Sequence, residues 1–316
     1  MTPLVIAAQA ALAVLPCVYW SQGVDSRAAL EAADIKRICV APEQVDAWRA
    51  AGFTVTAIGE ADFKTREPLA VPGTAPRAGV ASPTRSPWVV ANGWRFVRQP
   101  DKKYAYEVPA GKGALAAAEA SAYGGDAVLK VDPADLKAVG GMLTFLENLP
   151  AADLPPIADL AIVDDGSAVT GEVMNLLMRR NLLYQIVKSP SSQYPITIAI
   201  GSPEYPAAEA ADPSSFAQRI RRQLTDDRRS LRVYGSEVVI CRVTGNGSQA
   251  RVHLLNYGGR EIEGLRIRLR GAYATGEAYV AGGGRLALTD QVAADGVTEF
   301  SIPRLATYAV VDLKAK

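Results

Sequence analysis

Two adjacent carboxylates, Asp164 and Asp165, are the side chains whose position most strongly suggests chemistry. They follow an apolar run, Ile157–Val163, that is typical of a strand buried on both faces. Ligands of open α/β sheets gather beyond the carboxyl ends of such strands, and two carboxyl groups that flank a glycosidic bond can hydrolyse it. Asp164 and Asp165 are therefore the catalytic candidates. The same aspartates could instead cap the next helix, which is worth about 1 kcal/mol, and we favour this structural role.

A second group of polar and aromatic residues could bind a ligand. Asn92-Gly93 separates two short apolar runs and predicts a tight hairpin. The alternative is a strand that ends at Ala91 and leads into a binding loop. Aromatic faces beside polar groups suit sugar rings. The candidate ligand-binding residues are Trp88, Asn92, Trp94, Arg95, Tyr104 and Tyr106.

Other catalytic and metal sites lack the necessary residues. His253 is the single histidine and belongs to a strand-rich C-terminal segment, so neither a Ser-His-Asp nor a Cys-His set is expected. One histidine and two distant cysteines, Cys39 and Cys241, do not make a structural zinc site. We expect both cysteines to be buried thiols, although a disulfide between them stays open.

Neither a nucleotide cofactor nor a polyanionic partner is expected. Gly111-Lys112-Gly113 followed by Ala116 fits the dinucleotide fingerprint formally, but Pro109 precedes it and no acidic residue closes a second strand at the expected distance. The chain has 316 residues, of which 34 are basic and 33 acidic, and the net charge of +1 gives no field that would attract nucleic acid. The arginine-rich stretch between Arg219 and Arg232 is interpreted as a solvated helix end with mixed ion pairs.

The N-terminal segment indicates export. No charged side chain precedes Asp25, and Leu4–Leu15 has the length of a signal-peptide core. Ala8-Gln9-Ala10 or Ala11-Leu12-Ala13 could be the cleavage site, and the expected location is secreted or periplasmic. A membrane anchor is the alternative, but the segment is a poor spanning helix, so no stable membrane span is expected.

The pattern of elements predicts an α/β chain followed by an all-β part. Ile157–Val163, a helix with Val169, Val173, Leu176 and Leu177 on its apolar stripe, and Leu182–Val187 form one βαβ unit. Pro150–Pro156 is the clearest linker. From Glu237 onward, short alternating segments predict antiparallel strands. The expected divisions are 1–20, a signal peptide; 21–150, an N-terminal α/β region; 151–236, an α/β domain; and 237–316, a β-sandwich domain.

Three segments carry a resemblance to a known architecture: VDDGS, MNLLMRRNLLY and the closing FSIPRLATYAVVDL. Their order resembles the downstream, non-catalytic domains of secreted bacterial glycoside hydrolases, of which the family-42-type β-galactosidases are the nearest comparison. The resemblance implies a flavodoxin-like or amidotransferase-like α/β domain that assists oligomerisation, followed by a β-sandwich. The family's catalytic glutamates lie in an eight-stranded barrel, and about 130 residues before Pro150 are too few for one. No catalytic residue is carried over.

Two functions follow as hypotheses. The first is a secreted, carbohydrate-associated protein that binds a glycan or assists glycoside hydrolysis without a complete catalytic site; if it is an enzyme, it is glycoside hydrolase-like. The second is a non-catalytic structural or assembly protein of the cell envelope, which would form a homo-oligomer.

Overall fold

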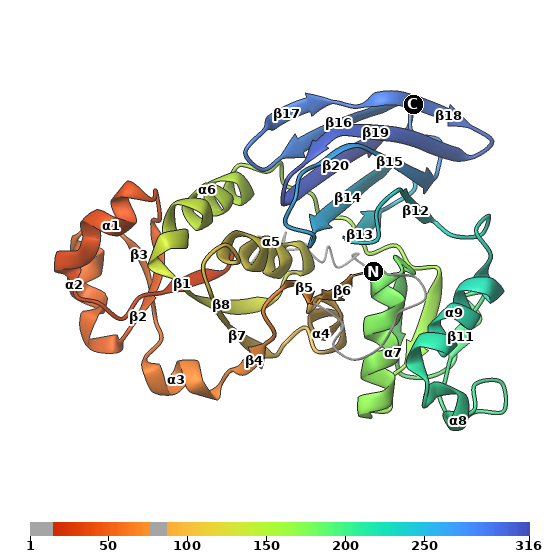
Figure 1. Ribbon diagram of the computed structural model, residues 1–316, viewed down its shortest axis with the longest axis horizontal. Coiled ribbons are helices and arrows are strands. Elements are labelled where there is room, and N and C mark those ends of the chain that lie inside the picture. Colours follow the sequence, from red (N-terminus) through yellow and green to blue (C-terminus); the bar gives the residue numbers. More distant parts are fainter. Residues whose placement is uncertain (1–14, 76–86) are drawn as a thin grey trace, which may run out of the picture.

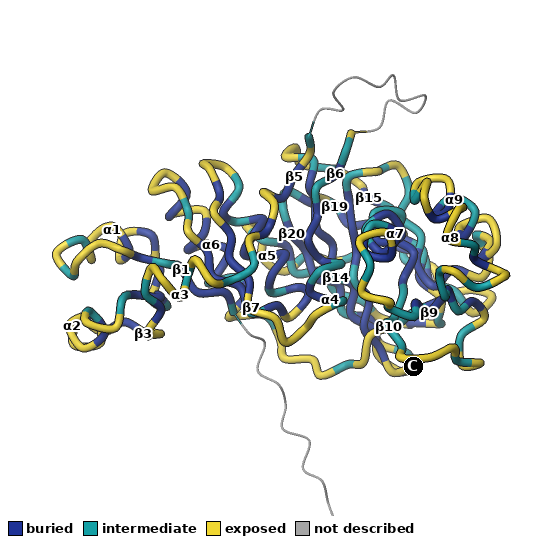
Figure 2. Tube along the Cα trace, turned by 90° about the horizontal axis from the view of Figure 1, so that it is seen from below, coloured by how far each residue is buried: buried dark blue, intermediate teal, exposed yellow. Residues whose placement is uncertain are grey.

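The computed structural model describes residues 15–75 and 87–316. Figure 1 shows an N-terminal α/β region at one end, a smaller α/β region around α7 to α9 at the other, and antiparallel sheets that lie against both. Figure 2 shows buried residues along β14, β19 and β20 and many exposed residues on α1, α2 and α8. The predicted class, α/β with a following all-β part, is confirmed. Among the described residues, no helix has the length and apolar character needed to cross a membrane.

The N-terminal region is built on a six-stranded parallel sheet with the order β3-β2-β1-β8-β7-β4. β1, the first strand of this sheet in the chain, pairs with β8, the last. β2 and then β3 lie outward on the side of β1, and β7 and then β4 lie outward on the side of β8. Joining the edge strands β3 and β4 would give a ring in chain order, as in β/α barrels, whereas a doubly wound sheet follows another order. The strands are β1 (Cys17–Tyr19), β2 (Arg37–Val40), β3 (Thr54–Ala57), β4 (Glu67–Leu69), β7 (Lys103–Val108) and β8 (Asp126–Val131).

In the part of this region that the structure describes, six short helices accompany the sheet, and the expected alternation of helix and strand is confirmed. Trp48 is fully buried and its ring packs edge-on against Phe53 at 4.9 Å, as a core residue does. The helices are α1 (Arg27–Ala32), α2 (Val45–Ala50), α3 (Glu60–Thr65), α4 (Gly93–Arg98), α5 (Gly113–Tyr123) and α6 (Leu136–Glu147).

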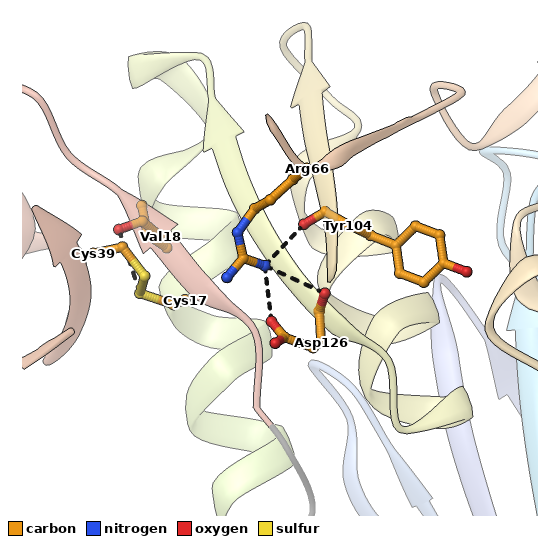
Figure 3. Close-up of a disulfide and its surroundings, with 6 residues drawn as sticks. All are labelled: Cys17, Val18, Cys39, Arg66, Tyr104 and Asp126. Carbon is orange, nitrogen blue, oxygen red and sulfur yellow. Dashed lines mark hydrogen bonds and ion pairs between the residues drawn. A yellow bond between two sulfur atoms is a disulfide. The ribbon is translucent and has the colours of Figure 1, made fainter. Parts of the chain in front are cut away.

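A disulfide joins Cys17 of β1 to Cys39 of β2 (Figure 3). The expectation that Cys39 is a free thiol is wrong, because the parallel pairing of β1 and β2 brings the two cysteines to a Cα separation of 5.8 Å. Cys241 alone is a buried thiol among the described residues. Beside the disulfide, Arg66, which directly precedes β4, binds the carboxylate of Asp126 at 2.8 Å (Figure 3). Because Asp126 begins β8, this ion pair attaches the start of β4 to the start of β8.

The N-terminal boundary also needs correction. β1 lies in the middle of the sheet and its residues fall within the segment 1–20 that we assigned to a signal peptide. Any cleavage that leaves the sheet intact must come before Cys17. Both predicted cleavage sites, Ala8-Gln9-Ala10 and Ala11-Leu12-Ala13, lie outside the described residues.

The hairpin predicted at Asn92-Gly93 is wrong. β6 (Trp88–Val90) pairs instead with β5 (Gly73–Ala75), and Asn92 is the residue before α4. The Asn92 side-chain oxygen accepts the backbone N–H of Ala70, and its amide nitrogen donates to the Ala70 carbonyl. These two bonds fix Asn92 at the start of α4. Sequence neighbours alone could not reveal this long-range contact.

The middle region contains the predicted βαβ unit. β9 (Leu160–Val163) and β10 (Tyr184–Val187) are parallel, and Val173, Leu176 and Leu177 of the intervening helix are buried. Val169 does not belong to the buried stripe, since it is 39% exposed at the first turn. The remaining elements are α7 (Ala168–Arg179), β11 (Thr197–Ile198), α8 (Ala207–Ala210) and α9 (Pro213–Leu224).

The C-terminal region consists of two antiparallel sheets, β12-β15-β19-β18 and β13-β14-β20-β16-β17, whose buried side chains form one core. Its first strand, β12, precedes the predicted boundary at residue 237. The strands are β12 (Leu231–Tyr234), β13 (Val239–Gly245), β14 (Gln249–Asn256), β15 (Ile262–Arg270), β16 (Thr275–Val280), β17 (Gly284–Ala287), β18 (Thr289–Ala294), β19 (Val297–Leu305) and β20 (Tyr308–Lys314).

The N-terminal and C-terminal regions share a core. Tyr257, Tyr308 and Val310 of the C-terminal region belong to the same buried cluster as the N-terminal helices. The linker at Pro150–Pro156 is held in place, since the Arg251 guanidinium donates to the Pro150 carbonyl at 2.7 Å. The regions therefore form one packed body rather than independent modules.

Candidate functional site

A buried carboxylate, Glu119 of α5, lies where the N-terminal and C-terminal regions meet. It is 0% exposed and accepts four hydrogen bonds. Asn92 donates its backbone N–H to Oε1 at 2.6 Å and its side-chain amide to Oε2 at 3.0 Å. Tyr106 and Tyr257 donate their hydroxyls at 2.5 and 2.6 Å. A buried carboxylate needs such donors, and this one joins β7, α4 and the end of β14.

Three of the six candidate ligand-binding residues are part of this core. Asn92, Tyr104 and Tyr106 are each at most 1% exposed. The Tyr104 hydroxyl donates to the backbone carbonyls of Arg95 and Gln99, at 3.0 and 3.2 Å. A sugar ring cannot stack on side chains that are already covered, so these three positions are corrected to structural ones.

The other three candidates, Trp88, Trp94 and Arg95, are partly exposed, but protein groups already contact them. The Arg179 guanidinium lies 3.7 Å from the centre of the Trp88 ring. The Trp94 ring has the Arg95 guanidinium 4.7 Å above it and packs against both neighbouring cores. Arg95 also forms an ion pair with Glu67 at 2.7 Å. These aromatic faces are therefore already in contact with protein groups.

Asp164 has a geometry that suits an ion pair better than acid catalysis. It lies after β9 and accepts two hydrogen bonds from Arg98 of α4, at 2.9 and 2.7 Å. The bonds from Arg98 lower the pKa of Asp164, so this carboxylate is ionised at neutral pH. A catalytic proton donor needs a raised pKa instead. The pair fastens the N-terminal region to the middle region.

Asp165 stabilises the turn that precedes α7. It accepts the backbone N–H of Ser167 at 2.9 Å. Burial acts to raise the pKa of Asp165, but hydrogen bonds from Thr170 and Ser167 prevail and lower it. The helix cap itself is Ser167, whose hydroxyl accepts the Thr170 N–H at 3.1 Å.

The loop that formally matches a dinucleotide fingerprint is already occupied by a side chain. The backbone N–H groups of Gly111, Lys112 and Gly113 donate to the Asp135 carboxylate at 2.6, 2.9 and 2.8 Å. These are the amides that would otherwise hold a phosphate. A Cβ at position 113 would lie only 2.5 Å from the Val139 side chain. Glycine at this position therefore allows α5 to pack closely on α6.

A pocket of about 270 Å³ lies where all three regions meet. Its lining comes from α4, the end of α5, the segment between α7 and β10, and β13, and includes the rings of Phe96, Tyr123 and Tyr184. Small-molecule sites favour such junctions and combine an apolar lining with a few polar groups. This pocket is the best candidate for a binding site among the described residues.

Two tyrosines that line this pocket have hydroxyls without a hydrogen-bond partner within the described structure. They belong to Tyr123 and Tyr184, and both oxygen atoms are buried. Burial raises the pKa of both hydroxyls well above the ordinary value, so both stay protonated and can donate. An unpaired buried hydroxyl is unfavourable, and a polar ligand atom would relieve it.

Arg242 supplies the pocket's cationic group. Its guanidinium donates to the Ala122 carbonyl and lies 5.8 Å from the centre of the Tyr123 ring. Burial lowers the pKa of Arg242, although not enough to neutralise it. None of the described lining residues is an aspartate or a glutamate, so the pocket has hydrogen-bond donors without a carboxylate pair.

Sequence reasoning missed Tyr123, Tyr184 and Arg242. Each lies in a regular helix or strand, and none stands in a recognisable motif. Their meeting point depends on how three regions pack. No signal within a single segment identifies it. Among the described residues, no group of three or more histidine, cysteine, aspartate or glutamate side chains could hold a metal ion.

No protein family model matches the chain, and no curated protein matches its sequence. Among solved structures, the chain is similar to alpha-L-fucosidase isoenzyme 2 from Paenibacillus thiaminolyticus, with a TM-score of 0.54 and 9% identity. That comparison covers 71% of this chain and 62% of the fucosidase.

Two β-galactosidases align with lower scores. The enzyme from Bacillus circulans sp. alkalophilus gives a TM-score of 0.41 and 10% identity, over 94% of this chain and 60% of that one. A GH42 β-galactosidase from G. stearothermophilus gives 0.36 and 9%, over 73% of this chain and 52% of that one. The chain thus spans less than two thirds of each protein. The fucosidase comparison confirms, at the level of architecture, that the chain resembles glycoside hydrolases.

Proposed function

We propose that the protein is a carbohydrate-associated protein that binds a neutral glycan in the pocket between its three regions. The observation that carries this proposal is the pair of unpartnered hydroxyls of Tyr123 and Tyr184 beside aromatic rings. A sugar offers oxygen atoms to accept these hydrogen bonds and an apolar ring face to contact the aromatic lining. At about 270 Å³ the pocket lies near the lower limit of small-molecule sites, which favours a short ligand.

Binding without hydrolysis is the better interpretation. A glycosidase needs two carboxyl groups on either side of the scissile bond, and the described lining has none. Asp164 and Asp165, the catalytic candidates, are held in an ion pair and a turn. We therefore propose a structural role for both.

Export and the finer fold assignment are part of the same proposal. The Cys17–Cys39 disulfide supports a secreted or periplasmic location, because disulfides persist in oxidising compartments. The βαβ unit with its parallel strands supports an amidotransferase-like or flavodoxin-like middle domain. The two antiparallel sheets with one core support a C-terminal β-sandwich.

Isothermal titration with L-fucose, galactose and galacto-oligosaccharides tests the proposal. These sugars correspond to the names of the fucosidase and galactosidases that the chain resembles in fold. The Tyr184→Phe variant removes one donor and should weaken binding about fivefold. Tyr279→Phe is the matched control, since Tyr279 lies outside the pocket. Binding that is absent for every sugar, or lost in Tyr279→Phe but retained in Tyr184→Phe, would contradict the proposal.

A further inference from the structure

A second cavity, of about 910 Å³, has a strongly basic lining. It lies between the end of α7, the helix α9 and the chain that leads from β12 into β13. Four arginine residues line it, together with a single described acidic residue, Glu237. The four arginines are Arg179, Arg180, Arg221 and Arg229.

One carboxylate near the cavity serves several guanidinium groups. Asp226 is shared by three arginines: its carboxylate lies 3.2 Å from Arg229, 3.5 Å from Arg232 and 3.8 Å from Arg221. Residues 1–14 and 76–86 contain no aspartate or glutamate, so they add no acidic counter-charge. Arg221, Arg229 and Arg232 thus share the Asp226 carboxylate, and the buried Asp159 carboxylate also attracts Arg229.

Arg229 shows that the cavity is more than a solvated helix end. Only 7% of its side chain is exposed, and its two terminal nitrogens bind the Asp226 carboxylate at 3.2 Å and the Arg180 carbonyl at 3.0 Å. Its Nε is buried and has no hydrogen-bond partner within the described structure. A buried guanidinium with an unused donor is unfavourable unless an acceptor reaches it.

We propose that this cavity binds a small ligand through an oxyanion, a carboxylate, sulfate or phosphate group, that pairs with Arg221 and Arg229. Guanidinium groups bind planar carboxylates and tetrahedral oxyanions through paired, charge-assisted hydrogen bonds. The cavity's volume is at the upper end of the range for small-molecule sites, so the oxyanion can belong to a larger molecule such as an acidic oligosaccharide. This site is separate from the pocket that contains Tyr184, and neither requires the other.

Titration calorimetry at low salt tests the site with three probes: inorganic sulfate, inorganic phosphate and trigalacturonate. Sulfate or phosphate that binds as tightly as trigalacturonate identifies a free anion as the ligand, whereas tighter binding of trigalacturonate identifies an acidic glycan. We expect saturable binding of at least one probe that weakens as sodium chloride is added. Saturable binding of none of the three overturns the proposal.

Three variants locate the binding. Arg221→Gln should weaken it about tenfold, because one charge-assisted contact is lost. Arg222→Gln is the matched control, since Arg222 is an exposed neighbour on α9 that does not line the cavity. Glu237→Gln removes the lining carboxylate and should strengthen binding. Equal effects of the Arg221 and Arg222 substitutions, or weaker binding by Glu237→Gln, would refute the site. Tyr184→Phe should leave these titrations unchanged, which separates this result from that of the neutral-glycan pocket.

Discussion

Replacing Tyr257 with phenylalanine should destabilise the N-terminal region, although Tyr257 belongs to the C-terminal one. Its hydroxyl donates to the buried Glu119 carboxylate at 2.6 Å. Loss of one hydrogen bond to a charged, fully buried group should lower the free energy of unfolding by about 1.5 to 3 kcal/mol. Because Glu119 keeps its three other donors, the variant should still fold.

Glu119→Gln should have a larger effect, about 2 to 4 kcal/mol. Each carboxylate oxygen accepts one N–H from Asn92, and neither N–H can reverse its role. The amide nitrogen of glutamine therefore meets a donor in either orientation. The double variant Glu119→Gln, Tyr257→Phe should lose less unfolding free energy than the two single variants lose added together, because the two residues share one hydrogen bond.

Urea unfolding followed by tryptophan fluorescence measures the loss of unfolding free energy around Glu119. All four tryptophans lie in the N-terminal region, so the signal reports that region and its contacts with the middle region. They are Trp20, Trp48, Trp88 and Trp94. Tyr279→Phe is the control, since it also removes a tyrosine–glutamate hydrogen bond, to Glu277 at 2.7 Å, but at a partly exposed site. A Tyr257→Phe midpoint within the error of the Tyr279→Phe midpoint would refute the reasoning.

Three further predictions concern pH, redox state and packing. Burial and the nearby Arg242 and Arg251 lower the pKa of His253 to about 3, so the unfolded chain takes up its proton first as the pH falls. Stability should therefore decline below about pH 6.5, by up to about 1.4 kcal/mol per pH unit, and pH-dependent urea unfolding of His253→Gln should lack this slope. The Cys17–Cys39 disulfide links residues 22 positions apart, so its reduction should cost about 3 kcal/mol of unfolding free energy. The thermal midpoint of unfolding should therefore fall when reductant is added, and an unchanged midpoint would contradict this prediction. Gly171→Ala should destabilise the contact of α4 with α7, because a Cβ there would lie 2.5 Å from Arg98 and 3.0 Å from the Trp94 ring. Urea unfolding should show a loss of about 1 to 3 kcal/mol. The control is Gly141→Ala, whose Cβ would contact nothing, and an equal or larger effect of that variant would contradict the prediction.

Local sequence signals predicted the elements well. The βαβ unit around α7 and the alternating C-terminal strands depend on residues a few positions apart, where periodicity and capping chemistry act. These parts of the fold follow from contacts within single elements.

The candidate sites depend on contacts between distant segments, and there the sequence was insufficient. Asn92 looked like a turn residue because its neighbours suit a hairpin, but its partners are Ala70 and Glu119. Tyr184 and Tyr123 come from segments about 60 residues apart and meet only through the packing of three regions. Pairing of Cys17 with Cys39 likewise follows from strand register rather than from spacing.

The central position of β1 beside β8 sets an order for folding. The pairings of β1 with β2 and of β2 with β3, and the disulfide, involve only the chain up to Ala57, so these three strands can pair before the rest of the sheet is synthesised. The middle of the sheet must wait until β8, at Asp126–Val131, has been synthesised, since Val18 pairs with Leu129. Until then, the free edge of β1 is a strand edge that a chaperone would have to protect.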